Sequence, residues 1–130
     1  MRKINFKNLS FIFYLISLFL PVFLGAEVYG IFALISGFLG FIEPNIYIVL
    51  PWFSNALFLF NFTFESKIGN FKFLLSFLTI TCSLFTFGIE TIPLDEGGAY
   101  TNVKPNFGFY IWIISYLFLL LSQVRNYKKK

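Results

Sequence analysis

Apolar residues along the chain form five stretches, and short segments with charged residues or prolines separate them. Four of the stretches approach the length of a helix that crosses a membrane, which needs about 20 predominantly apolar residues. We predict membrane-spanning helices over about 9–26, 46–64, 71–89 and 107–122. The fifth stretch, about 30–42, is predicted to form a short helix. It either enters the membrane from the outer face and returns, or lies along that face.

The stretch at about 30–42 decides the topology, because the chain ends share one side of the membrane only if it does not cross. It offers 15 uncharged residues between Glu27 and Glu43, which rise about 22 Å as a helix at about 1.5 Å per residue. This is shorter than the hydrocarbon core of about 30 Å. Its small residues recur on one helical face, where they would allow close packing. These residues are Ala33, Ser36, Gly37 and Gly40.

The basic residues favour four crossings over five. Cytoplasmic loops of membrane proteins are enriched in Lys and Arg. With four crossings, nine of the ten basic residues lie on the inner side and only Lys104 lies outside, whereas five crossings would split them four to six. We therefore predict one all-α transmembrane bundle over 1–130, with both termini cytoplasmic.

Composition agrees with a membrane protein. Hydrophobic residues make up 58% of the chain, charged residues 12%, and the mean hydropathy is +0.78, whereas soluble domains carry about 25% charged residues. The net charge of +4 does not indicate nucleic-acid binding, because the basic residues flank the apolar stretches, where positive-inside bias and snorkelling account for them. The lipid bilayer is the expected partner.

The sequence shows no evident catalytic constellation. The sequence has no histidine, and Cys82 is its single cysteine, so His-assisted catalysis, the common zinc sites and an internal disulfide are excluded. No ionisable residue lies at mid-depth in a predicted span, although ion-coupled transporters usually need one. We predict no enzyme activity and no cofactor or catalytic metal.

The longest predicted loop carries acidic residues next to glycines. Glu90, Asp95 and Glu96 precede Gly97 and Gly98 on the predicted outer side. Carboxylates in such a loop can bind calcium, but their spacing matches no EF-hand pattern. We expect a solvated acidic loop, with calcium binding as the alternative.

One polar residue falls near the centre of each predicted span, so the four should meet at one depth. These residues are Ser17, Asn55, Thr81 and Ser115. Polar groups inside a membrane bundle need partners, and hydrogen bonds between helices there contribute roughly 0.6 to 2 kcal/mol each. The hydrogen-bond partners of Asn55 are expected among the other three residues. The layer either joins the helices or lines a small cavity, and both interpretations remain open.

Two of the predicted spans contain a proline. Pro21 and Pro51 lie in the outer thirds of the first and second predicted spans, where we expect them to kink the helices.

The basic N-terminus and the apolar stretch behind it resemble a signal peptide. The best cleavage site, after Ala26, has the large Leu24 at position −3, which favours an uncleaved anchor over a cleaved signal.

Three short motifs carry a resemblance. They are Leu-Pro at 20–21, Trp-x-x-Asn at 52–55 and Gly-x-Tyr-x-Trp-x-x-Ser at 108–115. With them the chain resembles small bacterial inner-membrane proteins of uncharacterised function. Its basic, Phe-rich, four-span plan is also similar to immunity proteins that protect producers of pore-forming bacteriocins. We expect a non-enzymatic accessory or interaction protein, with a membrane protein or a second copy as partner; the alternative is a small oligomeric pore or transporter.

Overall fold

The computed structural model describes residues 5–42, 45–93 and 99–128, which are mostly helical. Five α-helices, two 3-10 helices and four short strands follow one another along these residues. The helices are α1 (Phe6–Leu18), α2 (Gly30–Ser36), η1 (Gly37–Phe41), α3 (Ile46–Phe64), α4 (Phe71–Leu84), η2 (Phe85–Gly88) and α5 (Phe107–Tyr127). The strands are β1 (Phe23–Leu24), β2 (Thr91–Pro93), β3 (Tyr100–Asn102) and β4 (Lys104–Pro105).

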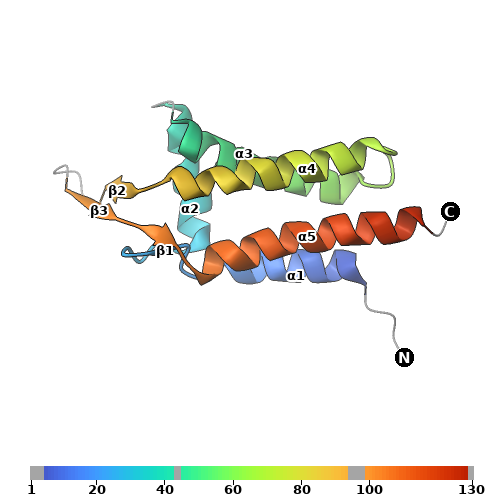
Figure 1. The fold of residues 1–130 in the computed structure, drawn as a ribbon, viewed down its shortest axis with the longest axis horizontal. Helices are drawn as coiled ribbons and strands as arrows, with labels where there is room; N and C mark the ends of the chain where they lie inside the picture. Colours follow the sequence, from blue (N-terminus) through green and yellow to red (C-terminus); the bar gives the residue numbers. More distant parts are fainter. Residues whose placement is uncertain (1–4, 43–44, 94–98, 129–130) are drawn as a thin grey trace.

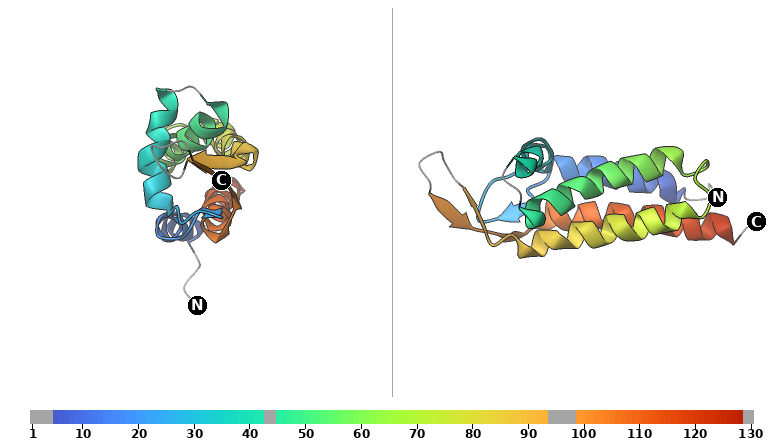
Figure 2. Two further views of the ribbon diagram at one scale, coloured as in Figure 1. Left: turned by 90° about the vertical axis from the view of Figure 1, so that its left-hand side faces the viewer. Right: turned by 90° about the horizontal axis from the view of Figure 1, so that it is seen from above.

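Four helices run along the long axis of the molecule, and α2 runs across it (Figure 1). Helix α1 lies antiparallel to α5, and α3 lies antiparallel to α4. Helix α2 leads from the α1–α5 pair to the α3–α4 pair at one end of the bundle (Figure 2, left). The strands lie at this end, which we call the strand end. Helix α1 begins and α5 ends at the opposite end, which we call the terminal end.

Three helical segments are long and apolar enough to cross a membrane. They are Ile46–Phe64, Phe71–Gly88 and Phe107–Tyr127, with 19, 18 and 21 residues. They match the second, third and fourth predicted spans. Large apolar side chains on their outward faces are exposed, among them Phe77 at 66% and Leu121 at 51%, as expected for surfaces that lipid covers.

The helix in the first predicted span is shorter than predicted, and it is not one of the three segments long enough to cross. Helix α1 ends at Leu18, whereas the apolar stretch continues to about residue 26. The predicted kink at Pro21 was wrong, because Pro21 lies beyond the end of α1 and forms an isolated β-bridge with Tyr29. Proline has no N–H and disfavours the helical conformation of the residue before it. Strand β1 then pairs antiparallel with β4. Pro51, by contrast, lies inside α3 as predicted.

Asparagine side chains begin three of the helices. Asn5, Asn45 and Asn106 cap α1, α3 and α5, and their side-chain oxygens accept backbone hydrogen bonds from Lys7, Tyr47 and Phe107 at 2.8 to 3.1 Å. Each cap satisfies one of the N–H groups that the first turn of a helix leaves without a partner.

The predicted short helix at about 30–42 is present as α2 and η1. Two residues of its predicted small-residue face, Gly37 and Gly40, are packed closely against α3. A Cβ atom on Gly37 would lie 2.7 Å from Trp52 Cδ1, and one on Gly40 would lie 2.7 Å from Ile48 Cγ2. The Trp52 indole also donates a 2.8 Å hydrogen bond to the Leu34 carbonyl. These contacts hold α2 and η1 against the first half of α3.

Candidate functional site

Asn55 joins three helices in the middle of the bundle. Its Oδ1 accepts hydrogen bonds from Tyr14 Oη at 3.0 Å, Trp112 Nε1 at 3.0 Å and Tyr116 Oη at 3.4 Å. Its Nδ2 donates to the carbonyls of Pro51 and Trp52 in its own helix at 3.3 and 3.2 Å. All the hydrogen-bonding capacity of this amide is therefore used inside the protein.

The partners that we predicted for Asn55 were wrong. Ser17 and Ser115 are buried, but each hydroxyl donates at 2.6 Å to a carbonyl in its own helix, that of Tyr14 or Trp112. Thr81 is exposed on the outward face of α4. The aromatic side chains of Tyr14, Trp112 and Tyr116 take the positions beside the Asn55 oxygen instead. The Trp112 and Tyr116 spacing of four residues, which places both on one face of α5, was the signal that could have identified the partners.

A cavity of about 640 Å³ lies between Asn55 and the strand end. Residues from α2, η1, the first half of α3, η2 and the first turns of α5 line it. Asn55 and Trp112 mark its deep end, because they lie farthest along α3 and α5 among the lining residues. Tyr100 on β3 also lines it and is 68% exposed, so the cavity opens beside the strands.

The described lining of the cavity is uncharged and mainly apolar. None of its described lining residues is an Asp, Glu, Lys or Arg, and most are aliphatic or aromatic. The lining contains two buried hydroxyl groups, and that of Thr86, unlike that of Ser17, has no hydrogen-bond partner. The Thr86 side chain is 3% exposed, and its Oγ1 is the one buried side-chain oxygen or nitrogen without a hydrogen-bond partner in the part of the chain that the structure describes. An unpartnered buried hydroxyl costs about 1 to 3 kcal/mol.

Aromatic residues close the cavity at its deep end. Tyr14, Phe58 and Tyr116 are at most 3% exposed, and with Leu119 they form the buried hydrophobic core. The Phe58 ring lies 4.8 Å from that of Tyr14 and 4.9 Å from that of Tyr116, measured between centroids. The cavity therefore does not continue along the bundle axis toward the terminal end.

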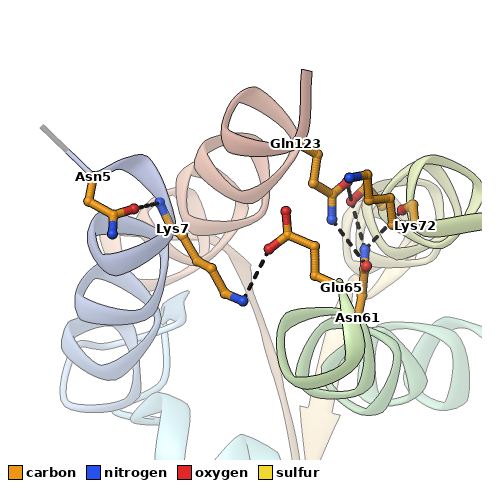
Figure 3. A network of polar contacts seen from close by, with 7 residues as sticks. Asn5, Lys7, Asn61, Glu65, Lys72 and Gln123 are labelled. Atoms are coloured by element: carbon orange, nitrogen blue, oxygen red, sulfur yellow. Dashed lines mark hydrogen bonds and ion pairs between the residues drawn. The ribbon is translucent and has the colours of Figure 1, made fainter. Parts of the chain in front are cut away.

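A second polar cluster joins α3, α4 and α5 nearer the terminal end (Figure 3). Asn61 donates to Ser76 at 2.8 Å, Ser76 donates to Gln123 at 2.8 Å, and Gln123 donates back to Asn61 at 3.1 Å. All three side chains are buried, and Asn61 also donates to the Lys72 carbonyl at 3.0 Å. Asn61 was not among the polar residues that we singled out from the sequence.

One ion pair connects α1 to the end of α3 beside this cluster. Lys7 Nζ lies 3.1 Å from Glu65 Oε2 (Figure 3) and 4.8 Å from the centroid of the Phe62 ring. The Glu65 side chain is only 8% exposed. A buried carboxylate needs such a partner, because an unpaired charge is costly to bury.

The predicted acidic loop is partly a β-hairpin. Glu90 directly precedes β2, and β2 pairs antiparallel with β3 from Thr91↔Asn102 to Pro93↔Tyr100. Asp95 and Glu96 lie outside the described residues. Within the described ranges, no group of three or more His, Cys, Asp or Glu side chains is placed to hold a metal ion.

Comparisons with known proteins did not identify a family for this chain. A scan against protein-family models found no matching family, and searches of curated proteins and of solved structures found no significant match.

Proposed function

We propose that this chain is a non-enzymatic accessory protein of a bacterial inner membrane that binds a small, uncharged and mainly apolar molecule. The cavity at the strand end is the observation that carries the proposal. Its volume of about 640 Å³ falls within the range of about 300 to 1,000 Å³ that small-molecule sites occupy. Because no described lining residue is charged, such a site favours burial of apolar surface and disfavours ions.

We further propose that α1, α3, α4 and α5 cross the membrane, with both termini cytoplasmic and the strand end periplasmic. The nine-to-one split of basic residues supports this orientation. Helix α1 has 13 residues and rises about 20 Å, and the more extended residues that lead to β1 make up the remaining depth. Helix α2 runs across the bundle (Figure 1), which is compatible with a segment that does not cross.

Reporter fusions test this topology. A reporter fused after Lys72 or after Lys130 should give a cytoplasmic signal, and one fused after Gly98 should give a periplasmic signal. A periplasmic signal from the C-terminal fusion would rule out four crossings and favour five.

Ligand binding can be measured through the fluorescence of the two tryptophans of the chain. Trp52 and Trp112 both line the cavity, and the sequence contains no other tryptophan. We would titrate the protein in lipid nanodiscs with 12-bromododecan-1-ol, whose bromine quenches indole fluorescence on contact. We expect saturable quenching, and weaker quenching by the trimethylammonium analogue, because its permanent charge would have to enter an uncharged cavity.

A cavity-filling variant provides the matched control. Ala33 lines the cavity, so Ala33→Phe should remove the saturable component and leave only the linear quenching due to probe dissolved in the lipid. Identical linear quenching in both proteins would show that the cavity binds no such molecule, and the proposed function would be rejected.

A pore through a single chain has less support. The aromatic rings of Tyr14, Phe58 and Tyr116 fill the bundle directly beyond the deep end of the cavity. Passage of a solute would require these rings to separate and the hydrogen bonds to Asn55 to break. We therefore retain binding, and not conduction, as the proposed role of one chain.

A further inference from the structure

The outward side of α2 and η1 is strongly apolar. No residue from 28 to 42 is charged. The exposed Ser36 hydroxyl donates a 2.7 Å hydrogen bond to the Phe32 carbonyl, so it does not depend on water. The large side chains that are at least 57% exposed on this segment, which we call the transverse face, are Phe32, Ile35, Phe38, Leu39 and Ile42. An apolar surface of this kind is covered by lipid or by another protein.

The lengths of α3 and α5 give a depth scale for this segment. Both helices begin at the strand end (Figure 1), and their 19 and 21 residues rise about 29 and 32 Å at about 1.5 Å per residue. These lengths match the hydrocarbon core of about 30 Å. In the proposed topology, Ile46 and Phe107 therefore lie near the membrane boundary at the strand end, and the Lys7–Glu65 ion pair lies near the other boundary.

The packing contacts of α2 lie below the boundary at the strand end. Gly37, directly after α2, packs against Trp52, which follows Ile46 by six residues, about 9 Å along α3. Gly30, the first residue of α2, packs against the Ser17 carbonyl in the last turn of α1. Helix α1 rises only about 20 Å, about 10 Å less than the thickness of the hydrocarbon core. Both ends of α2 therefore lie about 9 to 10 Å inside the hydrocarbon layer.

Segment η1 leads from this depth back toward the boundary. Gly40 packs against Ile48, which follows Ile46 by two residues, about 3 Å along α3. The backbone of the segment suits this environment, because helical N–H and C=O groups bond to one another and need no water. Where the chain enters α2, the Gly30 N–H donates to the Leu20 carbonyl at 3.0 Å.

We propose that α2 lies within the hydrocarbon layer of the leaflet at the strand end, parallel to the membrane, and that acyl chains cover the transverse face. The segment then neither crosses the membrane nor rests on the headgroups. This inference goes beyond the proposed function, because it requires the proposed crossings but no ligand, and it holds for either orientation of the bundle. Residues of α2 also line the cavity, so this wall would separate the cavity from lipid and not from water.

Spin labels test what covers the transverse face. The single cysteine is removed by Cys82→Ser, and a cysteine for the label is introduced as Ile35→Cys, Phe77→Cys or Tyr100→Cys. The three positions are exposed to the same extent, at 67%, 66% and 68%. Phe77 lies within α4, whereas Tyr100 lies in β3, beyond the ends of the helices (Figure 1). The Phe77 label is therefore the control for lipid, and the Tyr100 label is the control for water.

The labelled proteins are reconstituted in liposomes of phosphatidylethanolamine and phosphatidylglycerol. Relaxation of each label by oxygen, which partitions into lipid, is compared with relaxation by nickel ethylenediaminediacetate, which stays in water. We expect the oxygen-to-nickel ratio at Ile35 to be near that at Phe77 and several-fold above that at Tyr100. A label at Phe32 should give the same ratio as Ile35, and a label at Ile42 a lower one, because η1 leads toward the boundary.

The outcomes separate this inference from the proposed crossings and from ligand binding. Nickel access at Ile35 with oxygen access at Phe77 would overturn the inference and leave the crossings intact. Low access of both reagents at Ile35 and Phe32 would also overturn it, because a second copy or another protein would then cover the face. Nickel access at both Ile35 and Phe77 would overturn the crossings as well. The quenching assay with 12-bromododecan-1-ol uses none of these labels, so it tests the binding function independently.

Discussion

Replacement of Asn55 by leucine should destabilise the bundle more than replacement of any other single polar residue in the predicted mid-membrane layer. Asn55→Leu removes the acceptor of three donors on other helices, Tyr14, Trp112 and Tyr116. Hydrogen bonds between helices in membrane bundles contribute roughly 0.6 to 1.7 kcal/mol each. Three of them give an expected loss of about 2 to 5 kcal/mol in the free energy of unfolding. The lower part of this range is favoured, because the Tyr116 hydroxyl also lies 3.3 Å from Ser54 Oγ and keeps one partner.

Ser115→Ala is the matched control for this experiment. Ser115 is fully buried, as most of Asn55 is, but its hydroxyl bonds only to the Trp112 carbonyl in its own helix. We expect a loss of at most about 1 kcal/mol for this variant. The free energy of unfolding would be measured by reversible SDS titration in mixed micelles, with helicity followed by circular dichroism. Equal stability of Asn55→Leu and Ser115→Ala would refute the assignment of Asn55 as the residue that joins the three helices.

Two further substitutions test the other contacts. Gly37→Leu should loosen α2 and η1 from α3 and lower the yield of folded protein, because a Cβ at this position would already lie 2.7 Å from Trp52. The control is Ile35→Leu, at a position on α2 that is 67% exposed. Equal yields of the two variants would show that the segment is not packed at Gly37. Gln123→Leu should lower the free energy of unfolding by about 1 to 3 kcal/mol, since Asn61 and Ser76 each lose a buried partner. The control is Val124→Leu, at an exposed position next to Gln123, which should change the free energy of unfolding little. If Gln123→Leu were as stable as this control, the polar cluster would not stabilise the bundle.

Helix boundaries could be predicted from the sequence where local signals agreed with the apolar pattern. Helices α3 and α5 begin directly after Asn45 and Asn106, whose side chains cap them, and an uncharged stretch follows each cap. The end of α1 was misjudged because the apolar stretch continues past Leu18 while the backbone changes conformation. Hydrophobicity alone does not distinguish a buried helix from an extended segment, and the pairing of β1 with β4 depends on residues far apart in the sequence.

Less of the candidate site could be predicted from the sequence. Asn55 could be singled out because an amide at mid-depth needs partners. Its partners depend on how α1 and α5 are rotated about their axes, which mid-depth position alone does not determine, and the aromatic residues Tyr14 and Tyr116 were not considered as donors. Helix α2 runs across the bundle between the two helix pairs at the strand end (Figure 2), and its residues line the cavity together with residues of α3 and α5. No pattern within α2 itself predicts a cavity.

The pairing of the first helix with the last has a consequence for biosynthesis. Helix α1 leaves the ribosome first, but it lies against α5 (Figure 1), and Trp112 and Tyr116 of α5 supply two of the three donors to the Asn55 side-chain oxygen. In the proposed topology, Asn55 enters the bilayer before α5 is made, with only Tyr14 as a donor from another helix. Chains interrupted before Phe107 would then leave polar groups without partners in lipid.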